Sequence, residues 1–112
     1  LNSELTNYIK KFDNKNIVIW GAGHQSLAIM SLSGIAKNIT YIVDSAKFKQ
    51  NKYTSGTNIK IESPEQLRIN NPDVLIIIAA GYSDEVRSII FSEYPFIKNI
   101  AIVREDHLEI VE

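Results

Sequence analysis

The chain has 112 residues, 45% of them hydrophobic, with a net charge of −1 at pH 7 and no cysteine. This length is typical of one domain with a single core, and the near-neutral charge argues against a nucleic-acid-binding face or a polybasic membrane-binding segment. No apolar run approaches the roughly 20 residues that cross a bilayer, and a chain without cysteine has neither disulfide bonds nor thiolate metal ligands. We expect a cytoplasmic protein. Since the chain begins at Leu1 rather than Met, we also expect a longer parent protein.

The first half of the chain predicts two helices that alternate with two strands. Near the N-terminus, apolar residues recur at helical spacing, at Leu5, Tyr8, Ile9 and Phe12. The continuous apolar run 17–20 predicts a strand that is covered on both faces. Residues 24–33 predict a second helix that ends at Gly34, and residues 39–43 predict the second strand.

A long polar loop over residues 44–58 follows, and Ile59 and Ile61 then mark a short third strand. The segment Ser63-Pro64-Glu65-Gln66 predicts the start of a helix. In such a start Ser63 acts as the cap, the proline occupies the first helical position and Gln66 completes a capping box.

The last third of the chain begins with its most apolar run, residues 74–80, which predicts a central strand. Gly81 is expected to turn this strand into a helix whose first turn carries Asp84 and Glu85, two acids that favour the positive end of a helix dipole. Residues 100–103 predict a fifth strand, and residues 105–112 predict a short terminal helix.

The alternation of strands and helices predicts a single Rossmann-like α/β domain over residues 1–112, a three-layer sandwich. We expect a five-stranded parallel sheet of order 3-2-1-4-5 with right-handed crossovers and helices on both faces. Its switch point then lies between the strand that ends at Trp20 and the strand that ends at Ala80. Ligands of such sheets bind in the crevice at the carboxyl ends of the strands at this point.

A glycine turn and an acid are placed at this predicted crevice. Gly21 can adopt a positive φ and turn the strand into the helix, and Gly23 leaves room for a phosphate to approach the backbone. Asp44 follows the second strand, where an acid can bind ribose hydroxyls. The third glycine of the dinucleotide-binding fingerprint is replaced by Ser26. The alternative is a tight strand-to-helix turn without a ligand, with Asp44 as a solvated acid.

The other candidate side chains each have a plain alternative. His24 can donate to a phosphate or can be a solvent-facing residue at the start of a helix. In the segment Gly81-Tyr82-Ser83, the tyrosine can stack on a base or can be an aromatic residue at the rim. The lysines of the long loop can meet phosphates, although such charges are more often solvated: Lys47, Lys49 and Lys52.

Three segments of the chain carry a family resemblance: 21–26 (Gly-Ala-Gly-His-Gln-Ser), 41–46 (Tyr-Ile-Val-Asp-Ser-Ala) and the long stretch 48–67. With these segments the chain resembles the C-terminal domain of S-adenosylmethionine-dependent C-methyltransferases that act on nucleotide-linked deoxysugars. The chain departs from the usual family pattern at His24-Gln25, where many relatives have small residues. It departs again at Ser55, where relatives usually have proline before Gly56.

The resemblance implies a function for the chain as part of a larger enzyme. A middle domain of the same protein would bind S-adenosylmethionine, and the nucleotide-linked sugar would lie between that domain and this one, with Gln25 among the candidate contacts. Tyr53 belongs to the long loop that leaves the carboxyl edge of the sheet, so we expect it to contact the methyl-donor domain or the sugar nucleotide. The alternative is that Tyr53 folds back onto its own sheet and anchors the loop. We expect no catalytic residue, metal or bound cofactor in this domain, since no nucleophile–base arrangement or metal-ligand spacing is present. Two alternatives stay open, a stand-alone module that binds NAD or another nucleotide and an interaction domain without a ligand.

Overall fold

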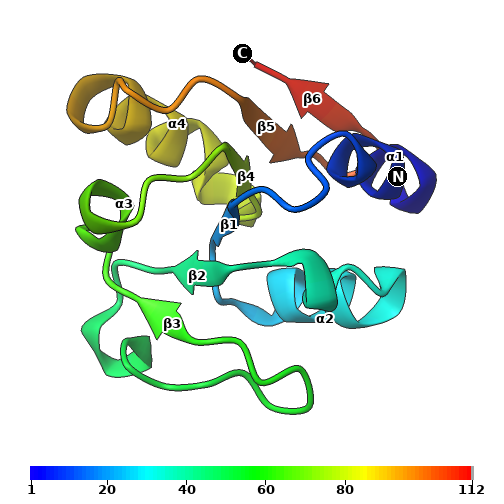
Figure 1. Ribbon diagram of the computed structural model, residues 1–112, viewed down its shortest axis with the longest axis horizontal. Coiled ribbons are helices and arrows are strands. Elements are labelled where there is room, and N and C mark those ends of the chain that lie inside the picture. The colour runs from blue at the N-terminus through cyan, green and yellow to red at the C-terminus, as the bar shows by residue number, and fades with distance from the viewer. Residues whose placement is uncertain (112) are drawn as a thin grey trace.

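A six-stranded sheet forms the middle layer of the molecule (Figure 1). The structure, a computed structural model, describes residues 1–111. The strands are β1 (Ile17–Trp20), β2 (Tyr41–Val43), β3 (Ile61–Glu62), β4 (Val74–Ile77), β5 (Ile100–Val103) and β6 (Leu108–Ile110). The α-helices are α1 (Asn2–Lys10), α2 (His24–Ser33), α3 (Gln66–Ile69) and α4 (Ser83–Glu93), and the short 3-10 helices are η1 (Ala36–Asn38), η2 (Lys47–Lys49) and η3 (Ala80–Tyr82).

The strand order is β3-β2-β1-β4-β5-β6, and the first five strands of this order are parallel. The predicted order 3-2-1-4-5 is therefore confirmed, with one strand added. Trp20 at the end of β1 pairs with Val43 on one side and Ile77 on the other. The carboxyl ends of the three central strands are therefore level, and the loops that leave them meet at one edge of the sheet.

Helices cover both faces because the strand residues alternate between two cores. Ile17, Ile19 and Ile76 belong to one core, and their neighbours Val18 and Leu75 belong to the other. The first core also holds buried residues of α1 and α2, and the second holds buried residues of α3 and α4. Figure 1 shows these two pairs of helices on opposite sides of the strands. Burial on both faces explains why the central strands have continuous apolar sequences.

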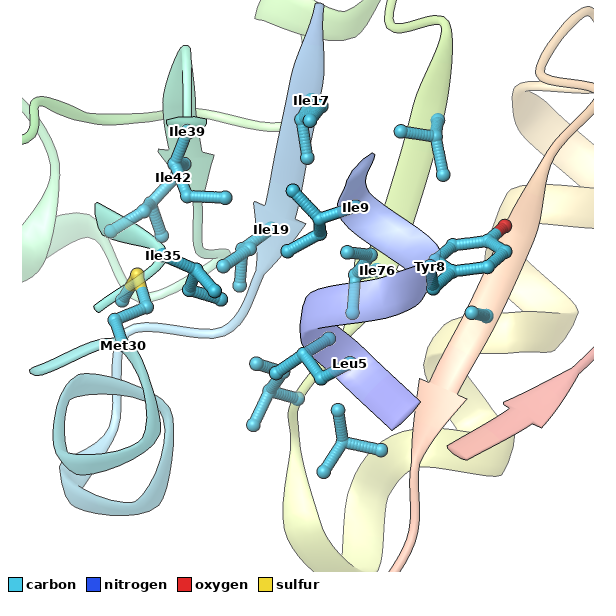
Figure 2. Close-up of a cluster of buried hydrophobic side chains, with 14 of the residues drawn as sticks. Leu5, Tyr8, Ile9, Ile17, Ile19, Met30, Ile35, Ile39, Ile42 and Ile76 are labelled. Carbon is cyan, nitrogen blue, oxygen red and sulfur yellow. The ribbon is translucent and has the colours of Figure 1, made fainter. Parts of the chain in front are cut away.

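Helix α1 lies against the sheet and presents the apolar side chains that the sequence pattern predicted. Leu5 and Ile9 point from α1 toward the sheet beside Ile19 and Ile76, and the ring of Tyr8 lies over the neighbouring strand β5 (Figure 2). The predicted helices over 24–33 and after the fourth strand are also confirmed, and α2 ends at Gly34 in the left-handed conformation, with φ 72°. This conformation suits glycine, which lacks the Cβ atom that opposes it in other residues.

The C-terminal segment was predicted wrongly as a helix. Its residues form β6, which runs antiparallel to β5 with Val103 opposite Leu108. Arg104 stabilises the hairpin, since its Nε donates to Glu109 at 2.8 Å and its Nη2 donates to Asp84 of α4 at 2.7 Å. Pairing with the buried β5 outweighs the weak local preference of this short segment. The predicted segment includes residue 112, which lies outside the described residues.

Two further sequence predictions differ from the structure in detail. The third strand is Ile61–Glu62, and Ile59 lies before it, in a turn where its N–H donates to Oγ1 of Thr54 and its carbonyl oxygen accepts the N–H of Thr54. The predicted loop 44–58 contains η2 and an antiparallel bridge between Tyr53 and Lys60. The loop therefore folds back along the outer edge of β3.

The helix predicted from Ser63 begins later than its sequence indicates. α3 starts at Gln66, and its first turn has no side-chain cap. The N–H of Gln66 instead donates to the backbone carbonyl of Ser63, so a turn precedes the helix and the capping box does not form.

Candidate functional site

A pocket of about 380 Å³ lies at the carboxyl ends of β1, β2 and β4, which is the predicted switch point. This volume is within the range of small-molecule sites in proteins. The residues that line it come from the ends of the three strands and from the loops and helices that follow them: Trp20, Gly21, Ala22, Gly23, His24, Gln25, Ser26, Asp44, Ser45, Lys49, Ile78, Ala79, Ala80, Tyr82 and Val86.

The glycine turn after β1 forms the floor of this pocket. Gly21 has φ 131°, which L side chains rarely adopt, and its N–H donates to the carbonyl oxygen of Val43 at 2.8 Å. A Cβ atom on Gly21 would lie 2.0 Å from the carbonyl oxygen of Ile78. A Cβ atom on Gly23 would meet no protein atom within 4 Å. Gly21 is therefore required by the packing of the fold, whereas Gly23 leaves its side open toward the pocket.

The first turn of α2 offers unused hydrogen-bond donors to the pocket. Gly23 is the N-cap residue, no side chain caps the turn, and the turn contains no acid. The first backbone N–H groups of a helix have no partner within the helix and carry its positive dipole end. Ser26 adds a side-chain donor, since it lines the pocket, is 1% exposed, and has a buried Oγ without a hydrogen-bond partner among residues 1–111.

Asp44 connects the end of β2 to the glycine turn. Its Oδ2 accepts the N–H of Ala22 and its Oδ1 accepts the N–H of Ala46, each at 2.9 Å. Both carboxylate oxygens are thus used to hold the backbone. The sequence predicted the position of Asp44 at the crevice, and the structure adds that the carboxylate braces the turn.

Lys49 brings a positive charge to the same place. Its Nζ lies 3.4 Å from the carbonyl oxygen of Ala22 and 3.9 Å from Oδ2 of Asp44. Among the described residues, it is the one lysine or arginine that lines the pocket. Sequence reasoning placed it with the solvated lysines Lys47 and Lys52. The sequence feature that could have singled out Lys49 is its position five residues after Asp44, because one turn of η2 returns the chain toward the crevice.

The segment after β4 forms the opposite wall, but Gly81 does not make the turn that was expected of it. The residue with positive φ is Ala80, at 48°, within the 3-10 helix η3 that precedes α4. Tyr82 lines the pocket and is 69% exposed. Gly81 and Ser83 do not line it, and the Oγ of Ser83 is buried without a partner in the described part of the chain.

Tyr53 lies apart from the other predicted site residues. Its backbone forms the bridge with Lys60 at the outer edge of β3, and its side chain is 59% exposed. It does not line the pocket. The structure thus brings together six of the predicted residues, namely Gly21, Gly23, His24, Gln25, Asp44 and Tyr82, and leaves Tyr53, Gly81 and Ser83 outside.

The donors and charges of the pocket are suited to noncovalent binding of an anion. His24 and Gln25 line it with exposed side chains. The described groups with a shifted pKa do not line the pocket; among them, hydrogen bonding to Arg104 lowers the pKa of Asp84, and burial raises the pKa of Tyr8 and Tyr94. In residues 1–111, no cluster of three or more His, Asp or Glu side chains could hold a metal ion, and no helix is long and apolar enough to cross a membrane.

Comparisons with known proteins agree with this architecture. The family model described as C-methyltransferase C-terminal domain matches residues 2–91. Over 88 residues the chain is 32% identical to C-methyltransferase NovU from Streptomyces niveus, a match that covers 78% of this chain and 20% of that protein. The chain therefore spans about a fifth of that relative. The crystal structure of UDP-D-quinovosamine 4-dehydrogenase from Vibrio fischeri shares the fold, with a TM-score of 0.67 and 16% identity over 88% of this chain and 93% of that one.

Proposed function

Because the chain belongs to the C-methyltransferase C-terminal domain family, we propose that it is the nucleotide-sugar-binding domain of an S-adenosylmethionine-dependent sugar C-methyltransferase. The observation that carries the proposal is the pocket at the switch point, where the glycine turn, the first turn of α2 and Lys49 face one space. The family supports the proposed class of enzyme, and the pocket supports the proposed position of the nucleotide on this domain.

In this proposal the domain binds and orients the substrate. The first turn of α2 and the open side of Gly23 receive the phosphates, because backbone N–H groups at a helix N-terminus bind anions. His24 and Gln25 lie at the mouth of the same turn, and the exposed ring of Tyr82 stacks on the base. S-adenosylmethionine is bound by the preceding domain of the intact enzyme, so this chain alone transfers no methyl group.

The outer loop of the domain faces the partner domain in this proposal. Tyr53 and Phe48 are 59% and 72% exposed and flank the segment that returns along β3. A tyrosine at a partly wet interface contributes both an apolar face and a hydroxyl group. The substrate would then lie between the pocket and the methyl-donor domain.

Binding of NAD is the second candidate, and one observation favours it. The sequence Gly21-x-Gly23 followed by an acid at the end of β2 is the pattern of dinucleotide-binding folds. Against it, each carboxylate oxygen of Asp44 already accepts a backbone N–H, which leaves fewer lone pairs for ribose hydroxyls. A domain that has kept the fold without a ligand is the third candidate.

A titration followed by amide NMR separates the three candidates. With deoxythymidine diphosphate glucose, the proposal expects shifts at Gly21, Gly23 and Asp44 and at the backbone beside Tyr82. Stronger shifts with NAD would favour the second candidate, and no shift with either compound would favour the third. Tight binding of S-adenosylmethionine to this chain would contradict the assignment of the methyl donor to another domain. The structural neighbour is a dehydrogenase of UDP-D-quinovosamine, a nucleotide-linked sugar, which supports this choice of first probe.

A further inference from the structure

We propose that Lys49 is the cation that receives the diphosphate of the ligand and that Asp44 holds it in place for this purpose. This inference rests on the proposed function and adds to it the chemical group that is bound and the side chain that binds it. Three features of the pocket support it: a cluster of unused donors, a positioned ammonium group and an acid whose two oxygens each accept a backbone N–H group.

The unused donors are the first feature. The opening turn of α2 has no side-chain cap and no acid, so its N–H groups are free to bind an anion. Ser26 lines the same space, and its buried Oγ has no partner in the described residues. A buried hydroxyl without a hydrogen bond is costly, and a phosphate oxygen would remove that cost.

The position of Lys49 is the second feature. Its side chain extends from η2 to the glycine turn, and its ammonium group contacts the carbonyl oxygen of Ala22 at 3.4 Å. An ammonium group has three donors, and this long contact leaves the others available. The neighbouring Lys47 begins the same 3-10 helix and does not line the pocket.

The orientation of Asp44 is the third feature. A carboxylate in a phosphate site would repel the ligand if its oxygens faced it. Here both oxygens accept backbone N–H groups, from Ala22 and Ala46, and Oδ2 lies 3.9 Å from Lys49 Nζ. Asp44 is thus a positioning residue, which holds the turn and attracts the ammonium group, and Lys49 is the group that touches the ligand.

The test uses this chain with Lys49→Gln, with Lys49→Arg as the conservative variant and with Lys47→Gln as the matched control. The probes are inorganic pyrophosphate, which reports on the anion site alone, and deoxythymidine diphosphate glucose, which reports on the whole ligand. We expect Lys49→Gln to bind both probes about tenfold more weakly, as for the loss of one charge-assisted hydrogen bond. We expect the arginine variant to keep most of the affinity and Lys47→Gln to equal the parent chain.

The salt dependence gives a readout that a change in folding would not produce. Affinity of the parent chain for pyrophosphate should fall more steeply with salt than affinity of Lys49→Gln, because one positive charge is missing from the variant. Equal affinity of the parent chain and Lys49→Gln for pyrophosphate, or no binding of pyrophosphate to the parent chain, would overturn the inference. Lysine-dependent pyrophosphate binding without any binding of the sugar nucleotide would support the anion site and overturn the proposed function instead.

Discussion

The Cα atom of Gly21 lies so close to Ile78 that an added Cβ would meet the Ile78 carbonyl oxygen at 2.0 Å. The turn after β1 and the end of β4 are therefore in direct backbone contact. The N–H of Ile78 also donates to the carbonyl oxygen of Trp20 at 3.0 Å. This contact joins the glycine turn after β1 to the segment after β4, which form the two sides of the crevice.

The first prediction is that Gly21→Ala strongly destabilises the fold. The methyl group would require backbone movement at Ile78, and alanine would be strained at φ 131°. We expect the free energy of unfolding to fall by about 3 kcal/mol or more, the sum of a strained backbone and an overpacked contact. Urea denaturation measures this. A loss of less than 1 kcal/mol would mean, on the same principles, that the turn can shift to accommodate a side chain.

The second prediction concerns Gly23, where the added methyl group meets no protein atom. Gly23→Ala should change the free energy of unfolding by less than about 1 kcal/mol, because φ is −84° and no contact is lost. It should weaken binding of deoxythymidine diphosphate glucose by about tenfold, since the methyl group would keep a phosphate from the backbone. Gly81→Ala is the control, because that residue also has open space around it but does not line the pocket. Unchanged affinity in Gly23→Ala would contradict a close approach of the ligand.

The third prediction is that Asp44→Ala loosens the glycine turn. Two backbone N–H groups, of Ala22 and Ala46, lose their acceptor. We expect a loss of about 2 kcal/mol in the free energy of unfolding and faster hydrogen exchange at these two amides. Asp13→Ala, at an exposed acid outside the switch-point pocket, is the control and should leave both quantities unchanged. If the exchange rates at Ala22 and Ala46 stay the same, the bracing role of Asp44 is wrong.

The fourth prediction concerns stability at alkaline pH. The Tyr41 hydroxyl donates to the carbonyl oxygen of Asn70 at 2.6 Å, and burial, followed by the negative charge of Glu62, raises its pKa above 10.0. Because the pKa is raised in the folded state, the protonated Tyr41 hydroxyl contributes fully to the free energy of unfolding below about pH 10. This contribution is lost as the pH rises further, since the tyrosine of the unfolded chain releases its proton at a lower pH than that of the folded chain.

Tyr41→Phe removes this titration. Above pH 10, its free energy of unfolding should fall less steeply than that of the parent chain, by up to about 1.4 kcal/mol per pH unit. Chemical denaturation at several pH values between about 9 and 12 measures the two slopes. This pH range begins about one unit below the ordinary pKa of tyrosine, near 10, and extends above it. Some pH dependence should persist, because the pKa of Tyr8 and Tyr94 is also raised. Parallel curves for the two proteins would rule out Tyr41 as the titrating group.

The fifth prediction separates an interface role of Tyr53 from a structural one. Because its side chain is largely exposed, Tyr53→Ala should change the free energy of unfolding of this chain by less than about 0.5 kcal/mol. In the intact methyltransferase it should raise the Michaelis constant for the sugar nucleotide, as expected for a contact with the partner domain or the substrate. Leu32→Ala, at an exposed residue of α2, is the control for loss of apolar surface. Destabilisation of the isolated chain with unchanged kinetics would contradict the interface role.

The elements predicted best are those whose burial is encoded locally. β1 and β5 match their predicted bounds, because a strand covered on both faces has a continuous apolar sequence. The segment that forms β6 has only three residues, and its strand state comes from pairing with β5 and from the ion pairs of Arg104. The start of α3 was also missed. Ser63 and Gln66 have the composition of a capping box, but the backbone forms a turn there.

Some residues of the site could be predicted from the sequence, and others could not. Gly21, Gly23 and Asp44 were predicted to meet because they follow strands whose order could be derived from the sequence. Lys49 could not be separated from the neighbouring lysines, since its selection depends on how η2 folds back toward Ala22.

The sequence by itself determined the alternation of elements, the order of the five parallel strands and the edge of the sheet at which the pocket lies. These follow from apolar runs, helical spacing and the handedness of crossovers, all of which act over short stretches of chain. The tertiary structure alone decided which polar groups face the pocket and which hold the backbone. Asp44 braces the turn at Ala22, and Gly21 is required by Ile78, because contacts between residues far apart in sequence depend on how the strands pack.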